Sequence, residues 1–98
     1  MNFTKKEIIN YLILLLIKNV DEGDGASLEM LNNALFQVLR HKPKLNFIDN
    51  NFSLLAEIQL LISEKYISEN LLRNYNINQA GINFININKS IGLLLKDL

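Results

Sequence analysis

The densest group of side chains that could do chemistry is the run Arg-His-Lys-Pro-Lys at residues 40–44. Lysine and arginine contact phosphate groups through a charge attraction that does not depend on nucleotide sequence. The same run follows a helical pattern, and cations at a helix C-terminus complement the helix dipole without binding a partner. We therefore take Arg40, His41, Lys42 and Lys44 as candidate phosphate contacts, with a solvated helix end as the alternative.

Amides and a hydroxyl further along the chain could take part in the same recognition. Asn50, Asn51, Ser53 and Gln59 are residue types that reach base edges or phosphates in protein–DNA complexes. Asparagine is abundant throughout the sequence, so an ordinary surface role is the alternative for these positions. Together with the basic run, they form the candidate DNA-binding residues.

Catalytic and metal chemistry find little support. The chain has no cysteine, which excludes disulfides, thiolate catalysis and cysteine-ligated zinc. Its single histidine, His41, stands beside lysines with no nearby acid to orient it. The acidic turn at 21–25, Asp-Glu-Gly-Asp-Gly, departs from a calcium loop at Gly23 and is expected to be a solvated turn. We expect no enzyme, no cofactor and no metal.

Composition sets the class of the protein. Hydrophobic residues make up 49% and charged residues 20% of the 98 positions, which is typical of one globular domain spanning 1–98. Ten basic and ten acidic residues cancel, so the overall basic balance common among nucleic-acid-binding proteins is missing, although a local patch could suffice. The absence of cysteine fits an intracellular protein, and we expect a cytoplasmic location.

The first strongly apolar stretch predicts a helix over about 4–20 that does not enter a membrane. Thr4 and Glu7 match a capping box, in which each side chain satisfies the other residue's backbone N–H. The uninterrupted apolar run covers only 11–17, whereas a spanning helix needs about 20 apolar residues. No small-residue cleavage site of a signal peptide follows it.

This helix is apolar on nearly every side between Ile8 and Ile17, and such a helix must be buried on every side. A small domain covers one side with its own core, and a second copy of the chain is the simplest cover for the other. We therefore expect a homodimer through this helix and the C-terminal helix. The predicted interface residues are Ile9, Ile13, Leu14, Leu16, Ile17, Leu94 and Leu98.

Periodicity places the remaining elements. Apolar residues at helical spacing predict helices over about 27–41, 52–66 and 89–97. Alternation predicts a β-hairpin with strands at about 71–78 and 82–88, joined by a loop that ends in Gly81. In that register either a bulge corrects the positions of Ile82 and Phe84, or both side chains protrude from the sheet and could meet a protein partner. The expected fold is α+β and mostly α.

Two stretches carry a family resemblance. "LLISEKYISEN" looks like the end of a third helix running into a first wing strand, and "INFININKSIGLLLKDL" looks like a second wing strand with its following helix. The order of three helices, hairpin and helix resembles winged-helix proteins, in particular small prokaryotic, often archaeal, transcription regulators. The sequence departs from them at Lys65, where glycine is common, and in a longer connection between the second and third helices than the usual turn of about 3–4 residues.

The resemblance implies two functions. The first is a dimeric, winged-helix, DNA-binding transcription regulator, whose third helix enters the major groove of double-stranded DNA. The alternative is a winged-helix adaptor that binds protein and not DNA. Zero net charge, the apolar Ile82 and Phe84, and acidic residues expected on the outer side of 52–66 favour the adaptor.

Overall fold

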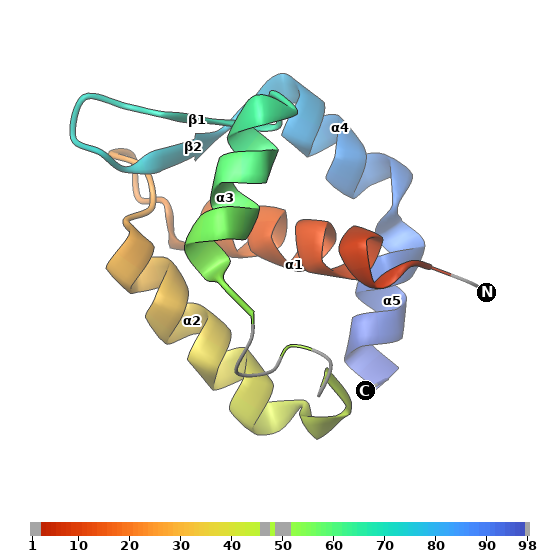
Figure 1. Ribbon diagram of the computed structural model, residues 1–98. Coiled ribbons are helices and arrows are strands. Elements are labelled where there is room, and N and C mark those ends of the chain that lie inside the picture. The colour runs from red at the N-terminus through yellow and green to blue at the C-terminus, as the bar shows by residue number, and fades with distance from the viewer. Residues whose placement is uncertain (1–2, 46–47, 49–51, 98) are drawn as a thin grey trace.

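The computed structural model describes residues 3–45, 48 and 52–97, and this part of the chain is mostly helical with one two-stranded sheet (Figure 1). It belongs to the α+β class. In chain order the elements are α1 (Lys5–Val20), α2 (Leu28–His41), the short 3-10 helix η1 (Pro43–Leu45), α3 (Leu54–Ser63), β1 (Ile67–Glu69), β2 (Tyr75–Ile77), α4 (Gln79–Ile87) and α5 (Lys89–Asp97).

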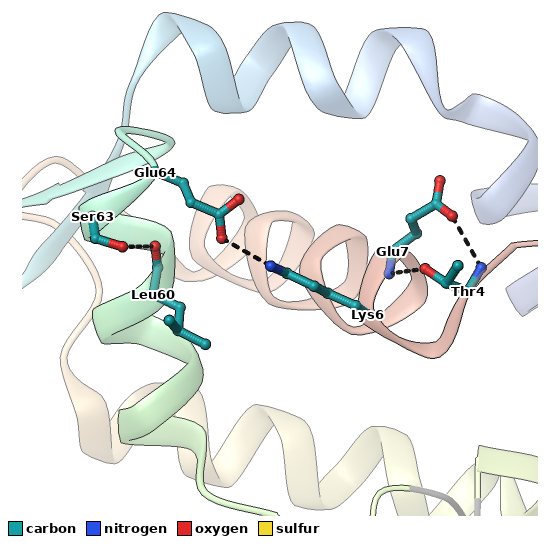
Figure 2. A network of polar contacts seen from close by, with 6 residues as sticks. All are labelled: Thr4, Lys6, Glu7, Leu60, Ser63 and Glu64. Atoms are coloured by element: carbon teal, nitrogen blue, oxygen red, sulfur yellow. Dashed lines mark hydrogen bonds and ion pairs between the residues drawn. The ribbon is translucent and has the colours of Figure 1, made fainter.

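The start of α1 confirms the predicted capping box. The Thr4 hydroxyl accepts a hydrogen bond from the Glu7 backbone N–H at 3.1 Å, and the Glu7 carboxylate accepts one from the Thr4 N–H at 3.0 Å (Figure 2). These bonds to Thr4 hold the pKa of the Glu7 carboxyl below its ordinary value. Among the described residues no helix combines the length and the apolar character needed to cross a membrane.

Helix α1 lies at the centre of the molecule, and other elements of the same chain cover most of it. α2, α3, α4 and α5 surround α1, and each of them contacts it, as does β2 (Figure 1). Leu14 and Ile17 are 0% exposed within a single chain, so they cannot touch a second copy. The dimer interface predicted at these residues is therefore wrong.

The other predicted interface residues divide into two groups, and at Ile9 and Leu94 the interface stays a prediction. Ile13 and Leu16 are buried in the core of one chain, and Ile9 and Leu94 are half-buried against it, while Leu98 lies outside the described residues. The expectation failed because it left one side of α1 open. That side is occupied by α4 and α5, and α4 was expected to be part of a hairpin.

The predicted second strand at 82–88 is wrong, because α4 spans Gln79–Ile87. Its inward residues are Gly81 and Ile85, both buried, with Asn88 half-buried, and this spacing of four and then three residues is helical. Isoleucine and asparagine alternate over the same stretch, and that alternation imitates a strand. The Gln79 amide also donates to the Asn83 side chain at 3.0 Å, one helical turn further on.

Gly81 has a different role from the predicted turn residue. A Cβ at this position would lie 2.5 Å from the Tyr66 carbonyl oxygen and 2.7 Å from a side-chain carbon of Ile77. Glycine therefore lets the first turn of α4 press against the residues at the base of the hairpin. Close approach of backbones is a common reason for glycine inside a regular element.

The hairpin lies earlier in the chain than predicted. β1 and β2 run antiparallel, with Ile67 opposite Ile77 and Glu69 opposite Tyr75. On its other edge Tyr75 forms an isolated antiparallel bridge with Ala26, with backbone hydrogen bonds of 2.8 Å in both directions. The α1–α2 connection is thereby fixed beside the hairpin (Figure 1).

Candidate functional site

The predicted phosphate-binding run lies at the far end of α2 from the hairpin. Arg40, His41 and Lys44 are exposed and Lys42 is half-buried. Ala26, bridged to β2, immediately precedes α2, and the helix of 14 residues is ~20 Å long. The basic residues therefore lie about that far along α2 from the hairpin, at the end that leads into η1 (Figure 1).

The other predicted DNA-binding residues divide into three groups. Ser53 caps α3, because its hydroxyl accepts a hydrogen bond from the Ala56 N–H at 3.2 Å. Gln59 is exposed on α3, where its amide is free to meet a partner. Asn50 and Asn51 lie outside the described residues.

The exposed face of α3 carries no charge. It consists of Leu55, Ala56, Gln59, Leu60 and Ser63. Of the two acids expected on the outer side of this helix, Glu64 is exposed but lies just beyond α3, and Glu57 is not exposed. Glu57 is half-buried in the first turn of α3, where a carboxylate complements the helix dipole.

The second acid, Glu64, lies just beyond the end of α3 and pairs with Lys6 of α1 at 3.4 Å (Figure 2). Beside it, the Ser63 hydroxyl donates to the Leu60 carbonyl at 2.7 Å. Lys65 follows with a left-handed φ of 66°. Its N–H donates to the Ile62 carbonyl, and the next N–H donates to the Leu61 carbonyl. This pair of bonds is the Schellman arrangement that ends many helices.

The hairpin tip presents two leucines to solvent. The loop between the strands covers residues 70–74, and in it Leu71 is 103% exposed and Leu72 is 65% exposed. Exposed apolar side chains that lie together can mark a protein-interaction site, whereas scattered single ones are ordinary. We call Leu71 and Leu72 the tip pair.

Asn70 holds the tip in one conformation. Its side-chain oxygen accepts hydrogen bonds from the Leu72 N–H at 2.9 Å and from the Asn74 N–H at 3.1 Å. Its side-chain amide donates to the Asp24 carbonyl and to the Asn76 side-chain oxygen, both at 2.9 Å. The tip pair is thus displayed on a loop whose polar groups are satisfied internally.

The acidic turn at 21–25 supports the same loop. The Asp21 carboxylate accepts bonds from the Gly23 N–H at 2.7 Å and the Gly25 N–H at 2.9 Å, and the Asn76 amide donates to its other oxygen at 3.2 Å. The backbone bonds from Gly23 and then Gly25, with the weaker bond from Asn76, lower the pKa of the Asp21 carboxyl. A stretch expected to be a solvated turn is therefore a structural support for the hairpin.

The protruding residues predicted from the sequence are not the ones that protrude. Ile82 and Phe84 lie on α4, where both are half-buried, and the Phe84 ring packs against Tyr66 with a centroid distance of 5.4 Å. The tip pair was missed because residues 71–78 were expected to form a strand. The available signal was the sequence Asn-Leu-Leu-Arg-Asn itself, because two adjacent leucines in a strand point to opposite faces.

Searches with protein-family models, among curated proteins and among solved structures found no match to this chain. The functional argument therefore depends on the geometry of the hairpin and of α3.

Proposed function

We propose that the protein is a winged-helix-like interaction module that binds another protein through the tip pair and the outer face of α3. The observation that carries this proposal is the full exposure of Leu71 and the 65% exposure of Leu72 on a hydrogen-bonded loop. A loop whose backbone is already held by hydrogen bonds loses less conformational entropy on binding than a mobile loop, so more of the free energy of burying its leucines contributes to affinity.

The order of elements supports the winged-helix part of the proposal. α1, α2 and α3 are followed by an antiparallel hairpin in the position of a wing. Lys65 has a left-handed backbone conformation at the position where winged-helix proteins commonly have glycine. The conformation that glycine favours is therefore present without the glycine. The chain departs from the expected order in having two helices, α4 and α5, after the hairpin.

A protein partner fits these surfaces better than DNA does. Binding to the phosphate backbone requires lysine or arginine, and the outer face of α3 has neither. The hairpin tip supplies only Arg73, beside two leucines. Apolar side chains at the centre of a contact are typical of protein–protein hot spots, which seat them in pockets of the partner.

DNA binding remains the competing hypothesis, and the exposed Arg40, His41 and Lys44 favour it. Those residues lie at the opposite end of α2 from the hairpin (Figure 1). A DNA duplex bound at these residues could also contact the tip pair only if it lay along the whole length of α2. The two functions therefore use different residues and are separable by mutation.

The test uses one double variant and one matched control. Leu71→Ser with Leu72→Ser removes the tip pair, and Ile87→Ser changes another strongly exposed apolar side chain, on α4. The tagged wild-type protein is used to capture partners from its host cells, and any captured protein is purified and titrated against all three forms. We expect the double variant to bind at least about tenfold more weakly, with Ile87→Ser unchanged and all three equally folded by circular dichroism.

The DNA arm is run on the same proteins. Fluorescence anisotropy with random duplex DNA at low and moderate salt is expected to show negligible binding. Binding with a steep salt dependence that is lost in Arg40→Gln and Lys44→Gln, but kept in the tip double variant, would replace the adaptor with the DNA-binding regulator.

A further inference from the structure

An apolar pocket of about 400 Å³ lies on the side of α1 that faces α2 and α5. It is separate from the tip pair and from the outer face of α3, since none of its lining residues belongs to either. Small-molecule sites commonly have volumes of ~300–1,000 Å³. The pocket is therefore large enough for a ligand. Because its volume is near the lower end of that range, it suits a ligand with one alkyl chain rather than two.

The walls of the pocket are mostly aliphatic. Leu12, Leu15 and Leu16 come from α1, Val38 comes from α2, and Leu95 comes from α5. Leu12, Leu16 and Leu95 are otherwise buried in the core, so the floor is rigid. Such walls exclude sugars and nucleotides, whose hydroxyls and phosphates would lose their hydrogen bonds to water without replacement.

The charges around the pocket have one sign. Lys42, Lys89 and Lys96 line it, and none of the described residues that line it carries a carboxylate. Lys89 and Lys96 are seven residues apart on α5, so they lie on one side of the helix, ~10 Å apart along its axis. A negative group between them would meet two cations and no opposing charge.

Gly92 brings the Tyr11 hydroxyl onto the same stripe. It lies three residues after Lys89 and four before Lys96 on α5, and it lines the pocket. A Cβ at Gly92 would stand 2.5 Å from the Tyr11 hydroxyl oxygen. The hydroxyl therefore occupies the space that a side chain would fill, and it packs on α5 between the two lysines.

The Tyr11 hydroxyl has no hydrogen-bond partner among the described residues, although the residue is only 6% exposed. Every fully buried polar side-chain atom in that part of the chain has a partner, so this hydroxyl must reach the open space of the pocket. It is a donor placed where an anionic head group would accept it.

We propose that the pocket binds an anionic amphiphile with a single alkyl chain, of the fatty-acid or alkyl-phosphate type. The head group lies between Lys89 and Lys96, beside the Tyr11 hydroxyl, from which it accepts a hydrogen bond. The chain lies along the leucines of α1. The site is independent of the proposed protein-binding surface, so either proposal can fail alone.

The experiment titrates the protein with dodecanoate and dodecyl phosphate below their micelle-forming concentrations, using calorimetry and backbone-amide NMR. Dodecanol and dodecyltrimethylammonium are the neutral and cationic controls. We expect saturable one-to-one binding of at least one anionic ligand, at least about tenfold tighter than either control, with the Gly92 amide among the shifted resonances. The tighter of the two anions identifies the head group.

Variants then locate the site. Lys89→Gln with Lys96→Gln is expected to weaken binding of the anion about tenfold and Tyr11→Phe about fivefold. Lys65→Gln, an exposed lysine beyond the end of α3 that does not line the pocket, leaves binding unchanged. Absence of saturable binding, equal affinity for dodecanol and the anions, or equal effects of the Lys65 and Lys89/Lys96 variants would each overturn the proposal.

Discussion

At the scale of single residues, asparagines that the sequence does not set apart turn out to hold the hairpin in place. Asn70, Asn74 and Asn76 were indistinguishable from the many other asparagines, yet they join the hairpin to the turn at 21–25. Asparagine suits this role because it both donates and accepts, and so can bond two backbone segments at once. Sequence patterns identify such residues poorly, because their partners lie about fifty positions away.

Asp21 gives this network a pH dependence with a definite sign. The backbone N–H groups of Gly23 and Gly25 lower its pKa in the folded state, so the ionised carboxylate stabilises the fold above the ordinary value of 3.8. That contribution is lost as pH falls through the lowered pKa. Glu7 acts in the same direction through its bonds to Thr4.

We therefore expect Asp21→Asn to have a lower Tm than the wild type at neutral pH. The difference is expected to shrink as the pH is lowered, because the wild-type carboxylate then becomes neutral as well. Thermal unfolding of both proteins, followed by circular dichroism over a series of acidic buffers, measures this difference. A gap in Tm that stays constant into strong acid would show that the hydrogen bonds of Asp21 do not depend on its charge.

At the scale of elements, helices with capping signals were predicted well and the short strands were not. Thr4 and Ser27 each cap the helix that follows them, and these capping bonds join residues only three positions apart, so they are visible in the sequence. Ser53 caps α3 in the same way, although it was predicted to contact DNA. α4 lacks a side-chain cap, and its alternating isoleucines follow a strand pattern. Tertiary contact through Gly81 decided its conformation, and no local pattern reveals that contact.

The end of α3 offers a test at this scale. Lys65 adopts a left-handed φ of 66°, which costs a residue with a Cβ ~1 kcal/mol relative to glycine. Lys65→Gly keeps both hydrogen bonds of the Schellman arrangement and removes that strain. We expect it to raise the free energy of unfolding by about 1 kcal/mol, measured by urea denaturation.

Lys18→Gly is the matched control, because Lys18 lies in the last turn of α1 with ordinary helical geometry. Glycine there is expected to destabilise the fold by up to about 1 kcal/mol. If Lys65→Gly lowers the free energy of unfolding as Lys18→Gly does, then the left-handed conformation of Lys65 carries no strain that glycine relieves.

At the scale of the whole molecule, the position of α1 decides what the surface can do. The composition of α1 correctly indicated a helix that is largely buried, but it did not identify the elements that bury it. Five other elements of the same chain contact it. A second copy is therefore not needed to hide Leu14 and Ile17, which are 0% exposed.

Variants of Leu14 distinguish burial of α1 by its own chain from burial of α1 by a second copy of the chain. Leu14→Ala is expected to lower the free energy of unfolding by about 2–5 kcal/mol, the usual cost of a cavity in a packed core. Leu93→Ala, at a side chain that is 63% exposed on α5, is expected to change it by no more than about 0.5 kcal/mol. Both are measured by urea denaturation at two widely spaced protein concentrations.

If one chain suffices to cover α1, the urea midpoint of the wild type and of each variant stays the same at both concentrations, because unfolding then releases no partner. A dimer that buries Leu14 would instead unfold at higher urea when more protein is present, since association shifts apparent stability by mass action. A midpoint that rises with concentration in the wild type and loses that dependence in Leu14→Ala would restore the interface at α1. It would also require a rearrangement of α4 and α5, which occupy that side of the helix.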